Sequence, residues 1–293
     1  MIHGRTEYTP SVERPRLTLP NQLRLGIHLI VNVEAWRYDA KLPRQVLSAP
    51  QGAEPVPDVP NYAWFEYGMR VGIWRVFEAL AAARGHVTLA INGLVCDTYP
   101  QVVQAAVRDG WEMMGHGYEQ RAMSLVEDER DVIRRTLDAL ERATGKRPRG
   151  WLGPGLVETS KTADILAEEG LAYCCDWGPA DDLPFGLQVA RGSLLAVPYP
   201  IDMNDIVMYG LEKRPDDALL ERGRRQFDRL YRESEKQAKI LAIAFHPWII
   251  GVPHRIGFLE RLLEYMLEKS GVGFMSGGEI ADWYSAAVAE KRR

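Results

Sequence analysis

Gly115-His116-Gly117-Tyr118-Glu119-Gln120 follows a short apolar segment, residues 111–114, that is expected to form a strand. A second histidine, His246, has a matching setting, because it follows the apolar run 240–245 and precedes Pro247. In chains that alternate strands with helices, ligand sites lie at the carboxyl ends of the strands. The two histidines are therefore site candidates, and a hydrogen-bonded structural role is the alternative for each.

Expected strands and helices alternate along the chain on both sides of these histidines. Strands are expected at residues 23–33, 87–91, 111–114, 149–152, 171–176, 193–198, 239–245 and 272–275. Helices are expected at 71–83, 99–108, 124–144, 159–169, 216–235, 258–269 and from 276 onward. The spacing of Ser124 and Glu127 is that of a capping box and predicts that the 124–144 helix starts at Ser124. This regular alternation of strands and helices favours a single distorted (β/α)7-type α/β barrel over residues 23–293, and a doubly wound open sheet is the alternative.

Two segments lack this periodicity. Residues 1–22 carry three prolines and are expected to be an irregular arm. Residues 35–67 carry five prolines and read as a long insertion loop, which in a compact domain is a lid, a subunit contact or disorder. Its aromatic residues argue against disorder and favour packing or a subunit contact over a platform for sugars. They are Trp36, Tyr38, Tyr62, Trp64, Phe65 and Tyr67.

Composition narrows the class of partner. The net charge of -4 gives no basic excess of the kind that nucleic acids or anionic membranes attract. No GxGxxG or P-loop pattern follows the first strand, so nucleotide binding has little support. The three cysteines include an adjacent pair, Cys174-Cys175, that is a poor disulfide, which favours a reducing cytoplasm. With no signal-peptide pattern and no long apolar run, we expect a cytoplasmic protein acting on a small molecule.

The strand-end motifs, taken in order, resemble the polysaccharide deacetylase superfamily. These motifs are Asn32-Val33-Glu34-Ala35, His116-Gly117-Tyr118, Gly150-Trp151-Leu152-Gly153-Pro154-Gly155, Asp176-Trp177 and Phe245-His246-Pro247. Three other segments, 67–75, 181–185 and 197–205, are similar to a narrower branch. That branch contains metal-independent allantoinases and intracellular, oligomeric peptidoglycan-deacetylase-like proteins. The resemblance implies a barrel fold, a C–N bond hydrolase and a homo-oligomer, either a dimer or a tetramer.

The resemblance also identifies where the metal site of the family has been altered. In metal-dependent members, two adjacent aspartates end the first strand, and a pair of histidines spaced H-x3-H completes the site. Glu34 takes the place of the aspartate that acts as base and Ala35 that of the ligand aspartate. Gln120 replaces the second histidine, and Leu152 the arginine that steers the base. Alanine has no ligand atom and an amide oxygen is a weak zinc ligand. We therefore expect no cofactor, and the alternative is zinc or another divalent transition metal held by Glu34, His116 and Gln120.

The implied activity is hydrolysis of a non-peptide C–N bond in a small cyclic or linear amide, as in the allantoinases. Glu34 would then activate water, His116 would position it or polarise the carbonyl, and His246 would be the partner acid. Substrate contacts, or ordinary turn, cap and core roles, are expected for Asn32, Trp177, Asp182, Asn204 and Asp205. One alternative is a metal-dependent N-deacetylase of an N-acetylated sugar or peptidoglycan fragment. Another is an inactive relative that only binds a small molecule.

Overall fold

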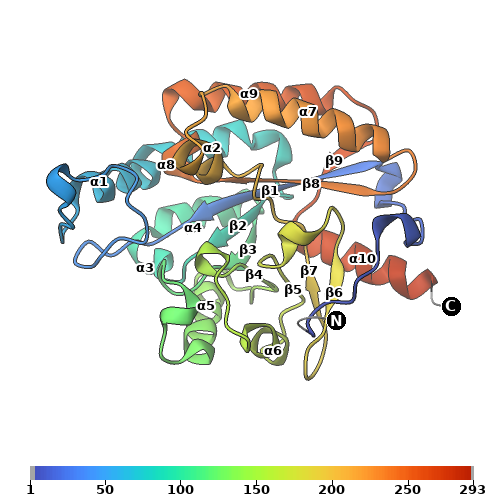
Figure 1. Cartoon of the computed structure of the whole chain (residues 1–293), viewed down its shortest axis with the longest axis horizontal. Helices are drawn as coiled ribbons and strands as arrows, with labels where there is room; N and C mark the ends of the chain where they lie inside the picture. The colour runs from blue at the N-terminus through green and yellow to red at the C-terminus, as the bar shows by residue number, and fades with distance from the viewer. Residues whose placement is uncertain (1–3, 292–293) are drawn as a thin grey trace.

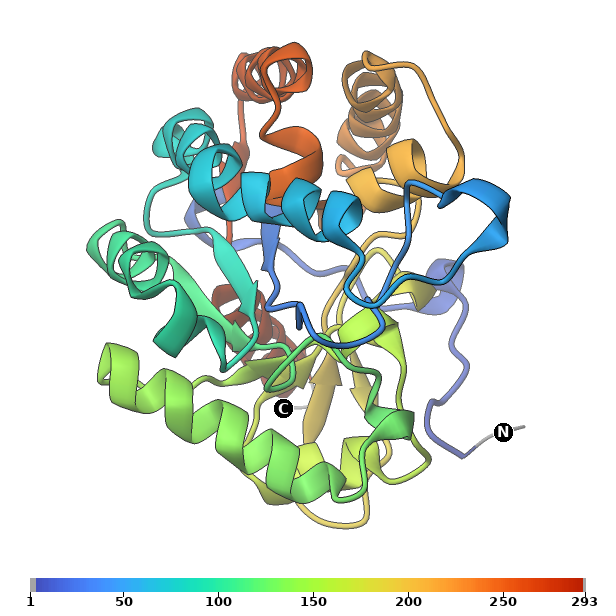
Figure 2. The same cartoon turned by 90° about the vertical axis from the view of Figure 1, so that its left-hand side faces the viewer.

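A curled sheet of mainly parallel strands forms the centre of the computed structural model, which describes residues 4–291 (Figures 1 and 2). The order of the strands is β6-β7-β5-β4-β3-β2-β1-β8, and β9 pairs with β1. The strands are β1 (Leu25–Val33), β2 (Thr88–Ile91), β3 (Glu112–Gly115), β4 (Gly150–Trp151), β5 (Tyr173–Cys174), β6 (Phe185–Leu187), β7 (Leu194–Ala196), β8 (Lys239–Phe245) and β9 (Val272–Phe274). Every pair is parallel except β6 with β7. The predicted α/β class with a distorted (β/α)7-type barrel is thereby confirmed.

Helices cover the outside of the barrel. They are α1 (Val59–Tyr67), α2 (Ile73–Ala79), α3 (Val95–Thr98), α4 (Pro100–Arg108), α5 (Glu129–Thr144), α6 (Thr162–Glu168), α7 (Ala218–Glu233), α8 (Pro247–Ile250), α9 (Pro253–Leu267) and α10 (Gly277–Lys291). The helix α10 closes the amino-terminal end of the barrel, where the Gly277 amide donates to Thr88 and the Gly278 amide donates to Glu112. No helix within residues 4–291 combines the length and apolar character needed to cross a bilayer.

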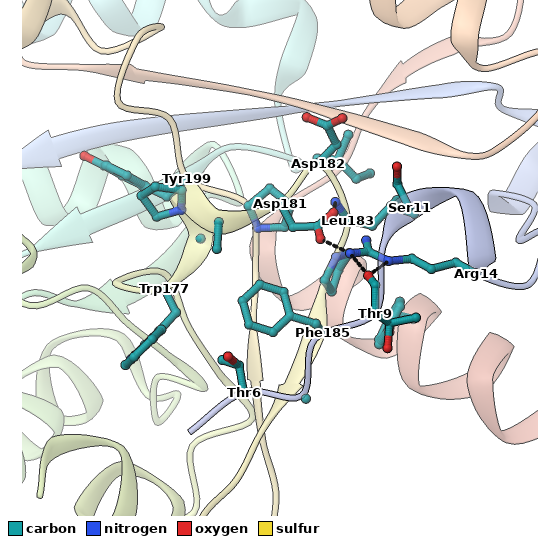
Figure 3. Close-up of a pocket in the computed structure, with 18 of the residues that line it drawn as sticks. Thr6, Thr9, Ser11, Arg14, Trp177, Asp181, Asp182, Leu183, Phe185 and Tyr199 are labelled. Carbon is teal, nitrogen blue, oxygen red and sulfur yellow. Dashed lines mark hydrogen bonds and ion pairs between the residues drawn. The ribbon is translucent and has the colours of Figure 1, made fainter. Parts of the chain in front are cut away.

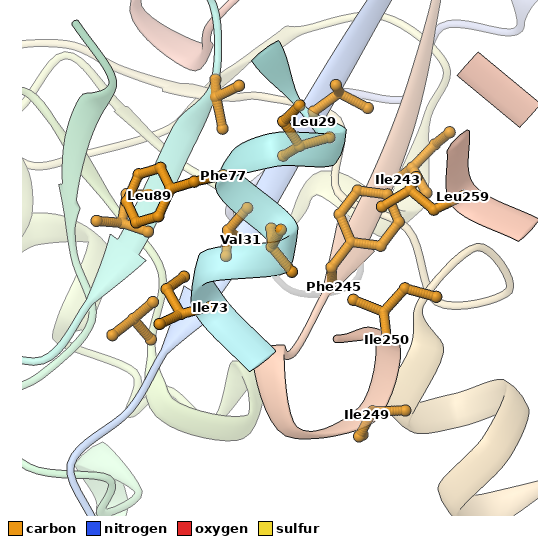
Figure 4. Close-up of a cluster of buried hydrophobic side chains, with 14 of the residues drawn as sticks. Leu29, Val31, Ile73, Phe77, Leu89, Ile243, Phe245, Ile249, Ile250 and Leu259 are labelled. Atoms are coloured by element: carbon orange, nitrogen blue, oxygen red, sulfur yellow. The ribbon is translucent and has the colours of Figure 1, made fainter. Parts of the chain in front are cut away.

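The alternation of side chains along β1 decides which residues face the site. All nine residues of β1 are buried, as expected for a parallel strand covered on both faces. Leu29 and Val31 point outward and pack under the helices, whereas Ile30 packs inside the barrel. Figure 4 shows the outward cluster, formed by residues of β1, β2, α2, β8, α8 and α9. Because the period of a strand is two, Asn32 and then Glu34 continue the inward series at the mouth of the barrel.

The barrel has a seam between the two edge strands of the sheet, β6 and β8. At the mouth the seam is closed by a bridge between Asn204 and Ala244, and near the other end the Ile240 amide donates to the Asp182 carbonyl. The arm of residues 4–22 covers the seam and is held by an ion pair of 2.5 Å between Arg14 and Asp181. A pocket remains between the arm and the seam (Figure 3).

Three local expectations need correction. The last part of the 35–67 segment is the helix α1, which begins at the N-cap Asp58 and runs through a π-helical turn, Gly68–Gly72, into α2. The long charged helix starts at Glu129, because Asp128 rather than Ser124 caps it by accepting from the Asp131 amide at 3.0 Å. Ser124 lies in a separate 3-10 turn. The strand β6 was not expected, since it has three residues and directly follows Pro184.

Candidate active site

Glu34 is the carboxylate at the centre of the barrel mouth. Its side chain is 8% exposed, and two N–H groups hold it. The Trp36 indole donates to Oε2 at 2.6 Å and the Gln120 amide donates to Oε1 at 2.7 Å. Burial raises the pKa of Glu34 above its ordinary value, although the charges of His246 and Arg44 and the bond from Trp36 oppose this. A carboxylate with a raised pKa is a better proton acceptor once it is ionised.

His246 stands directly after β8, with one ring nitrogen facing Glu34 and the other facing Asp205. Its Nδ1 lies 2.6 Å from Asp205 Oδ1, and its main-chain N–H donates to Asp205 Oδ2 at 2.7 Å. Its Nε2 lies 3.7 Å from Glu34 Oε1. Burial lowers the pKa of His246, but Asp205 and Glu34 together outweigh burial and raise it. The imidazolium is therefore favoured, which suits a general acid.

His116 has the opposite protonation state. Its Nδ1 lies 2.7 Å from the main-chain carbonyl of Leu152, which can only accept, so Nδ1 carries the proton. Burial lowers the pKa of His116 to about 4. Its Nε2 therefore presents a lone pair, 4.0 Å from Glu34 Oε1. Such a nitrogen can accept a hydrogen bond from water, but it has no N–H with which to polarise a carbonyl.

Asn92 joins the parts of the site and was not expected. It follows β2, is completely buried, and accepts from the Ala35 amide at 2.7 Å. Its own amide donates to the main-chain carbonyl of His116 and to Gln120 Oε1, the latter at 3.3 Å. The Asn92 side chain thus links the chain after Glu34 to the loop that carries His116 and Gln120. In the sequence, the feature that could have identified Asn92 is its position as a polar residue directly after the apolar run 87–91.

Asn32, Asn204 and Tyr199 form a buried network beside Glu34. Asn32 donates to the Phe245 carbonyl at 3.2 Å and accepts from the Tyr199 hydroxyl at 3.3 Å. Asn204 donates to the same hydroxyl at 3.2 Å. The structure thus brings Asn32 and Asn204 to the site, but their amide groups bind the protein itself. Both oxygens of Asp205 likewise bind His246, so Asp205 orients the histidine rather than offering a free acceptor to substrate.

The structure does not bring Asp182 to this cluster. Its carboxylate lies 2.9 Å from Nζ of Lys239, the first residue of β8, whereas His246 follows the last. Seven residues of strand separate the two ends, or roughly 20 Å. The Trp177 indole donates to Glu158 at 2.9 Å, and Trp177 lines the seam pocket (Figure 3). The expectation that Asp182 lines the catalytic pocket is therefore corrected, and the substrate contact expected of Trp177 stays a prediction.

The donor set at the mouth does not match a zinc site. Ala35 has no ligand atom, and its amide binds Asn92. Gln120 turns its NH2 group toward Glu34, and its oxygen accepts from Asn92. Of the three positions that the family uses for a metal, only His116 offers a strong ligand. No group of three His, Cys, Asp or Glu suited to a metal occurs in residues 4–291. The residues at this mouth therefore do not fit a metal ion.

The comparisons with known proteins agree with this barrel and its strand-end motifs. Residues 54–174 match the sequence profile of the family described as "Polysaccharide deacetylase". The chain is similar to this family over that segment. A Schizosaccharomyces pombe protein named "Putative polysaccharide deacetylase" is 27% identical, covering 91% of this chain and 92% of the relative. The Helicobacter pylori "Peptidoglycan deacetylase" is 23% identical, covering 79% of this chain and 89% of the relative.

Solved structures of the superfamily superpose closely. The Puue allantoinase has a TM-score of 0.82 at 26% identity, covering 96% of this chain and 98% of that one. A probable polysaccharide deacetylase of Pseudomonas aeruginosa PAO1 has a TM-score of 0.78 at 25% identity, covering 94% and 95%. The predicted resemblance and the predicted enzyme class, a C–N bond hydrolase of the amidohydrolase or deacetylase type, are confirmed at the level of the superfamily.

Proposed function

We propose that this protein hydrolyses a C–N bond of a small cyclic or linear amide in the manner of an allantoinase. The observation that carries the proposal is the pairing of Glu34 with His246 at 3.7 Å. One partner is a carboxylate with a raised pKa and the other an imidazole whose pKa is also raised. Amide hydrolysis requires both a base and an acid, because water must lose a proton and the leaving nitrogen must gain one.

The proposed reaction begins with a water molecule between Glu34 and His116. His116 Nε2 accepts one of its hydrogens and so orients it, and Glu34 takes the proton as the oxygen bonds to the carbonyl carbon. The tetrahedral intermediate then collapses and the C–N bond breaks. His246 Nε2 gives its proton to the departing nitrogen, leaving a carboxylic acid and an amine, which in a ring amide are parts of one molecule.

The same contacts return the site to its starting state. The acid product ionises by releasing its proton to solvent, and Glu34 passes the proton that it gained to the neutral Nε2 of His246, 3.7 Å away. Asp205 keeps the imidazole in one orientation and stabilises its charged form throughout, in the way that the aspartate of a serine-protease triad does. With water as the reactant and solvent as the final proton acceptor, these steps balance.

The test is turnover of allantoin, hydantoins and linear ureides by the purified protein. We expect Glu34→Gln and His246→Ala each to lower kcat by about 10²- to 10⁴-fold, the range typical of a lost general base or acid. Asp182→Asn is the matched control, since it alters a carboxylate at the far end of β8. Full activity of both site variants on an identified substrate would eliminate the assignment.

A metal-dependent N-deacetylase is the second candidate. Its support is the unprotonated Nε2 of His116 beside Glu34, which is the form of histidine that binds metals, and the naming of the Helicobacter pylori relative. It predicts near-stoichiometric transition metal in protein purified without affinity-bound metal, and loss of that metal on Gln120→Ala. It also predicts acetate release from chitin oligomers with added zinc or cobalt.

We further propose that the protein is cytoplasmic and acts as a homo-oligomer with no nucleic-acid or membrane partner. Cys174 and Cys175 are buried free thiols, which fits a reducing compartment. Trp64, Val71 and Trp74 lie along α1, the π-helical turn and α2 and are 36%, 36% and 38% exposed, which suits a subunit contact. Sedimentation of the wild type and of Trp74→Glu tests the assembly, and an unchanged monomer would contradict it.

A further inference from the structure

The peptide bond between Leu152 and Gly153, directly after β4, is held by side chains from both neighbouring strands. β4 lies between β3 and β5 in the sheet. On one side, Nδ1 of His116, which follows β3, lies 2.7 Å from the Leu152 carbonyl oxygen. On the other side, the Gly153 amide donates at 2.7 Å to Oδ1 of Asp176, which follows β5 by one residue. The carbonyl and the N–H belong to one planar peptide unit, so a single amide group connects His116 with Asp176.

The sheet fixes the chain on the near side of this peptide. The Leu152 amide donates to the Gly115 carbonyl at 2.9 Å, and the Cys175 amide donates to the Trp151 carbonyl at 2.9 Å. These bonds continue the parallel ladders of β3, β4 and β5 to the ends of the strands. Beyond them, the two flanking side chains take over from the ladder and bind the carbonyl of residue 152 and the N–H of residue 153.

Gly153 makes the direction of this peptide depend on Asp176. The backbone of Gly153 lies at φ -67° and ψ 140°. Turning the peptide plane over would carry φ into the positive region, which glycine tolerates far better than other residues do. A Cβ at this position would lie 3.1 Å from Oδ1 of Asp176 and 3.3 Å from Oδ2, so the carboxyl group rests directly on the glycine. Asp176 therefore keeps the N–H on its own side and the carbonyl on the side of His116.

The direction of the peptide decides which ring nitrogen of His116 carries the proton. A carbonyl facing Nδ1 requires a proton on Nδ1, which leaves Nε2 with a free lone pair 4.0 Å from Glu34 Oε1. An inverted peptide would present the Gly153 N–H to Nδ1, and the proton would then belong on Nε2. That nitrogen would donate to Glu34 or to water, and it could no longer accept the hydrogen of the water that Glu34 activates.

The other oxygen of Asp176 shows which form of the side chain makes this contact. Oδ2 of Asp176 is buried and accepts from no N–H or hydroxyl group within residues 4–291, and the same holds for Oε1 of Glu158. Oε2 of Glu158 accepts from the Trp177 indole at 2.9 Å. Burial and the neighbouring Glu158 raise the pKa of Asp176 well above its ordinary value. An uncharged carboxyl group still accepts through Oδ1, so a carboxamide at this position would make the same bond to Gly153.

We propose that Asp176 is a positioning residue for His116, acting through the Leu152–Gly153 peptide to keep the proton of the imidazole on Nδ1. The effect on the tautomer rests on the geometry of the three strands, and the use that the reaction makes of it rests on the proposed amide hydrolysis. At metal sites, loss of the group that orients a histidine costs about 10- to 100-fold in affinity or activity. We expect a similar fall in kcat here.

The test is nitrogen-15 NMR of histidine-labelled protein at pH 7, with His116→Ala to identify the His116 resonances. We expect the proton on Nδ1 in wild type and in Asp176→Asn, which keeps an acceptor oxygen. In Asp176→Leu, which has none, a large share of molecules should carry the proton on Nε2. Asp181→Leu is the matched control, because Asp181 also accepts from a backbone amide, that of Leu183 at 3.1 Å, and should leave the His116 tautomer unchanged.

Rates on an identified amide substrate give the second readout. Asp176→Leu should lower kcat by about 10- to 100-fold with KM within about twofold, because Asp176 acts on the water-orienting histidine and not on the substrate. Asp176→Asn should recover most of the lost rate. Thermal unfolding checks that each variant is folded, and Asp176→Ala carries the same test if Asp176→Leu is not.

The outcomes separate this inference from the proposed function. A proton that stays on Nδ1 in the folded Asp176 variant, or an equal change in Asp181→Leu, refutes the role of Asp176 whatever the activity. If the tautomer changes as expected but wild type hydrolyses no amide, the proposed function fails and the control of His116 by Asp176 stands. If wild type is active and the tautomer changes while kcat does not, the contribution of Asp176 to the reaction is refuted and the hydrolase stands.

Discussion

Nδ1 of His246 lies 2.6 Å from Oδ1 of the completely buried Asp205, while Nε2 of the same ring faces Glu34 at 3.7 Å. The imidazole is therefore held between two carboxylates. Under the proposed function Glu34 exchanges a proton with it, and Asp205 is a positioning residue for the acid.

Asp205→Asn is expected to lower kcat by roughly 10²- to 10⁴-fold, because an amide neither stabilises the imidazolium nor selects its tautomer as a carboxylate does. It should also shift the alkaline limb of the rate profile to lower pH, since Asp205 raises the pKa of His246. Both effects are measured in one set of kcat/KM values against pH, with Asp182→Asn as control. A lower rate with an unmoved alkaline limb would contradict this role.

The rate of the wild type should follow a bell-shaped pH profile. The pKa of Glu34 is raised above 4.5 by burial, so the base is lost as pH falls through that raised value. The pKa of His246 is raised above 6.5 because Asp205 and Glu34 outweigh burial, so the acid is lost as pH rises through it. The two limbs belong to the coupled pair, because the groups lie within 4 Å of each other. A rate independent of pH between 5 and about 9 would contradict this pairing.

His116→Ala should behave differently from the other site variants. A neutral histidine that only orients water contributes position rather than a proton, so we expect a loss of about 100-fold in kcat. Neither limb of the pH profile should move substantially, because the pKa of His116, about 4, lies below the working range. A shift of the acid limb to the ordinary range of a carboxylate would instead show that His116 controls the ionisation of Glu34.

Gly72→Ala tests the packing that holds the loop of His246. A Cβ at Gly72 would meet the Pro247 carbonyl oxygen at 2.1 Å, so the backbone must shift. We expect a loss of about 1–3 kcal/mol in the free energy of unfolding, as for other overpacked sites, together with reduced kcat. Gly186→Ala is the control, since nothing lies within 4 Å of its Cβ position. Both variants are unfolded in urea, and equal midpoints of unfolding would contradict this expectation.

The barrel could be predicted because its strands are continuous apolar runs. The segment 239–245 is observed as β8, Lys239–Phe245, with the same bounds, since no competing turn signal interrupts it. The helix α1 could not be predicted in this way, because its aromatic residues are spread around the helix and leave no apolar stripe. Its start depends on the side chain of Asp58, which is a tertiary feature as much as a local one.

Site residues could be predicted from the sequence where they directly follow a parallel strand. Residues elsewhere in the chain could not be placed in this way. Glu34, His116 and His246 come together because each directly follows a parallel strand. Asp182 lies well beyond the end of β5, after the 3-10 turn Gly178–Ala180, and its carboxylate contacts Lys239 at the start of β8. Asn92 carries no motif, so only the folded chain identifies it as a neighbour of Glu34 and His116.

The proposed base and the proposed acid come from distant parts of the chain. Glu34 and its indole partner Trp36 follow the first strand, whereas Asp205 and His246 lie beyond residue 200. The pair is therefore complete only when β8 has paired with β1. Formation of the proposed catalytic pair should for that reason report on closure of the barrel during folding.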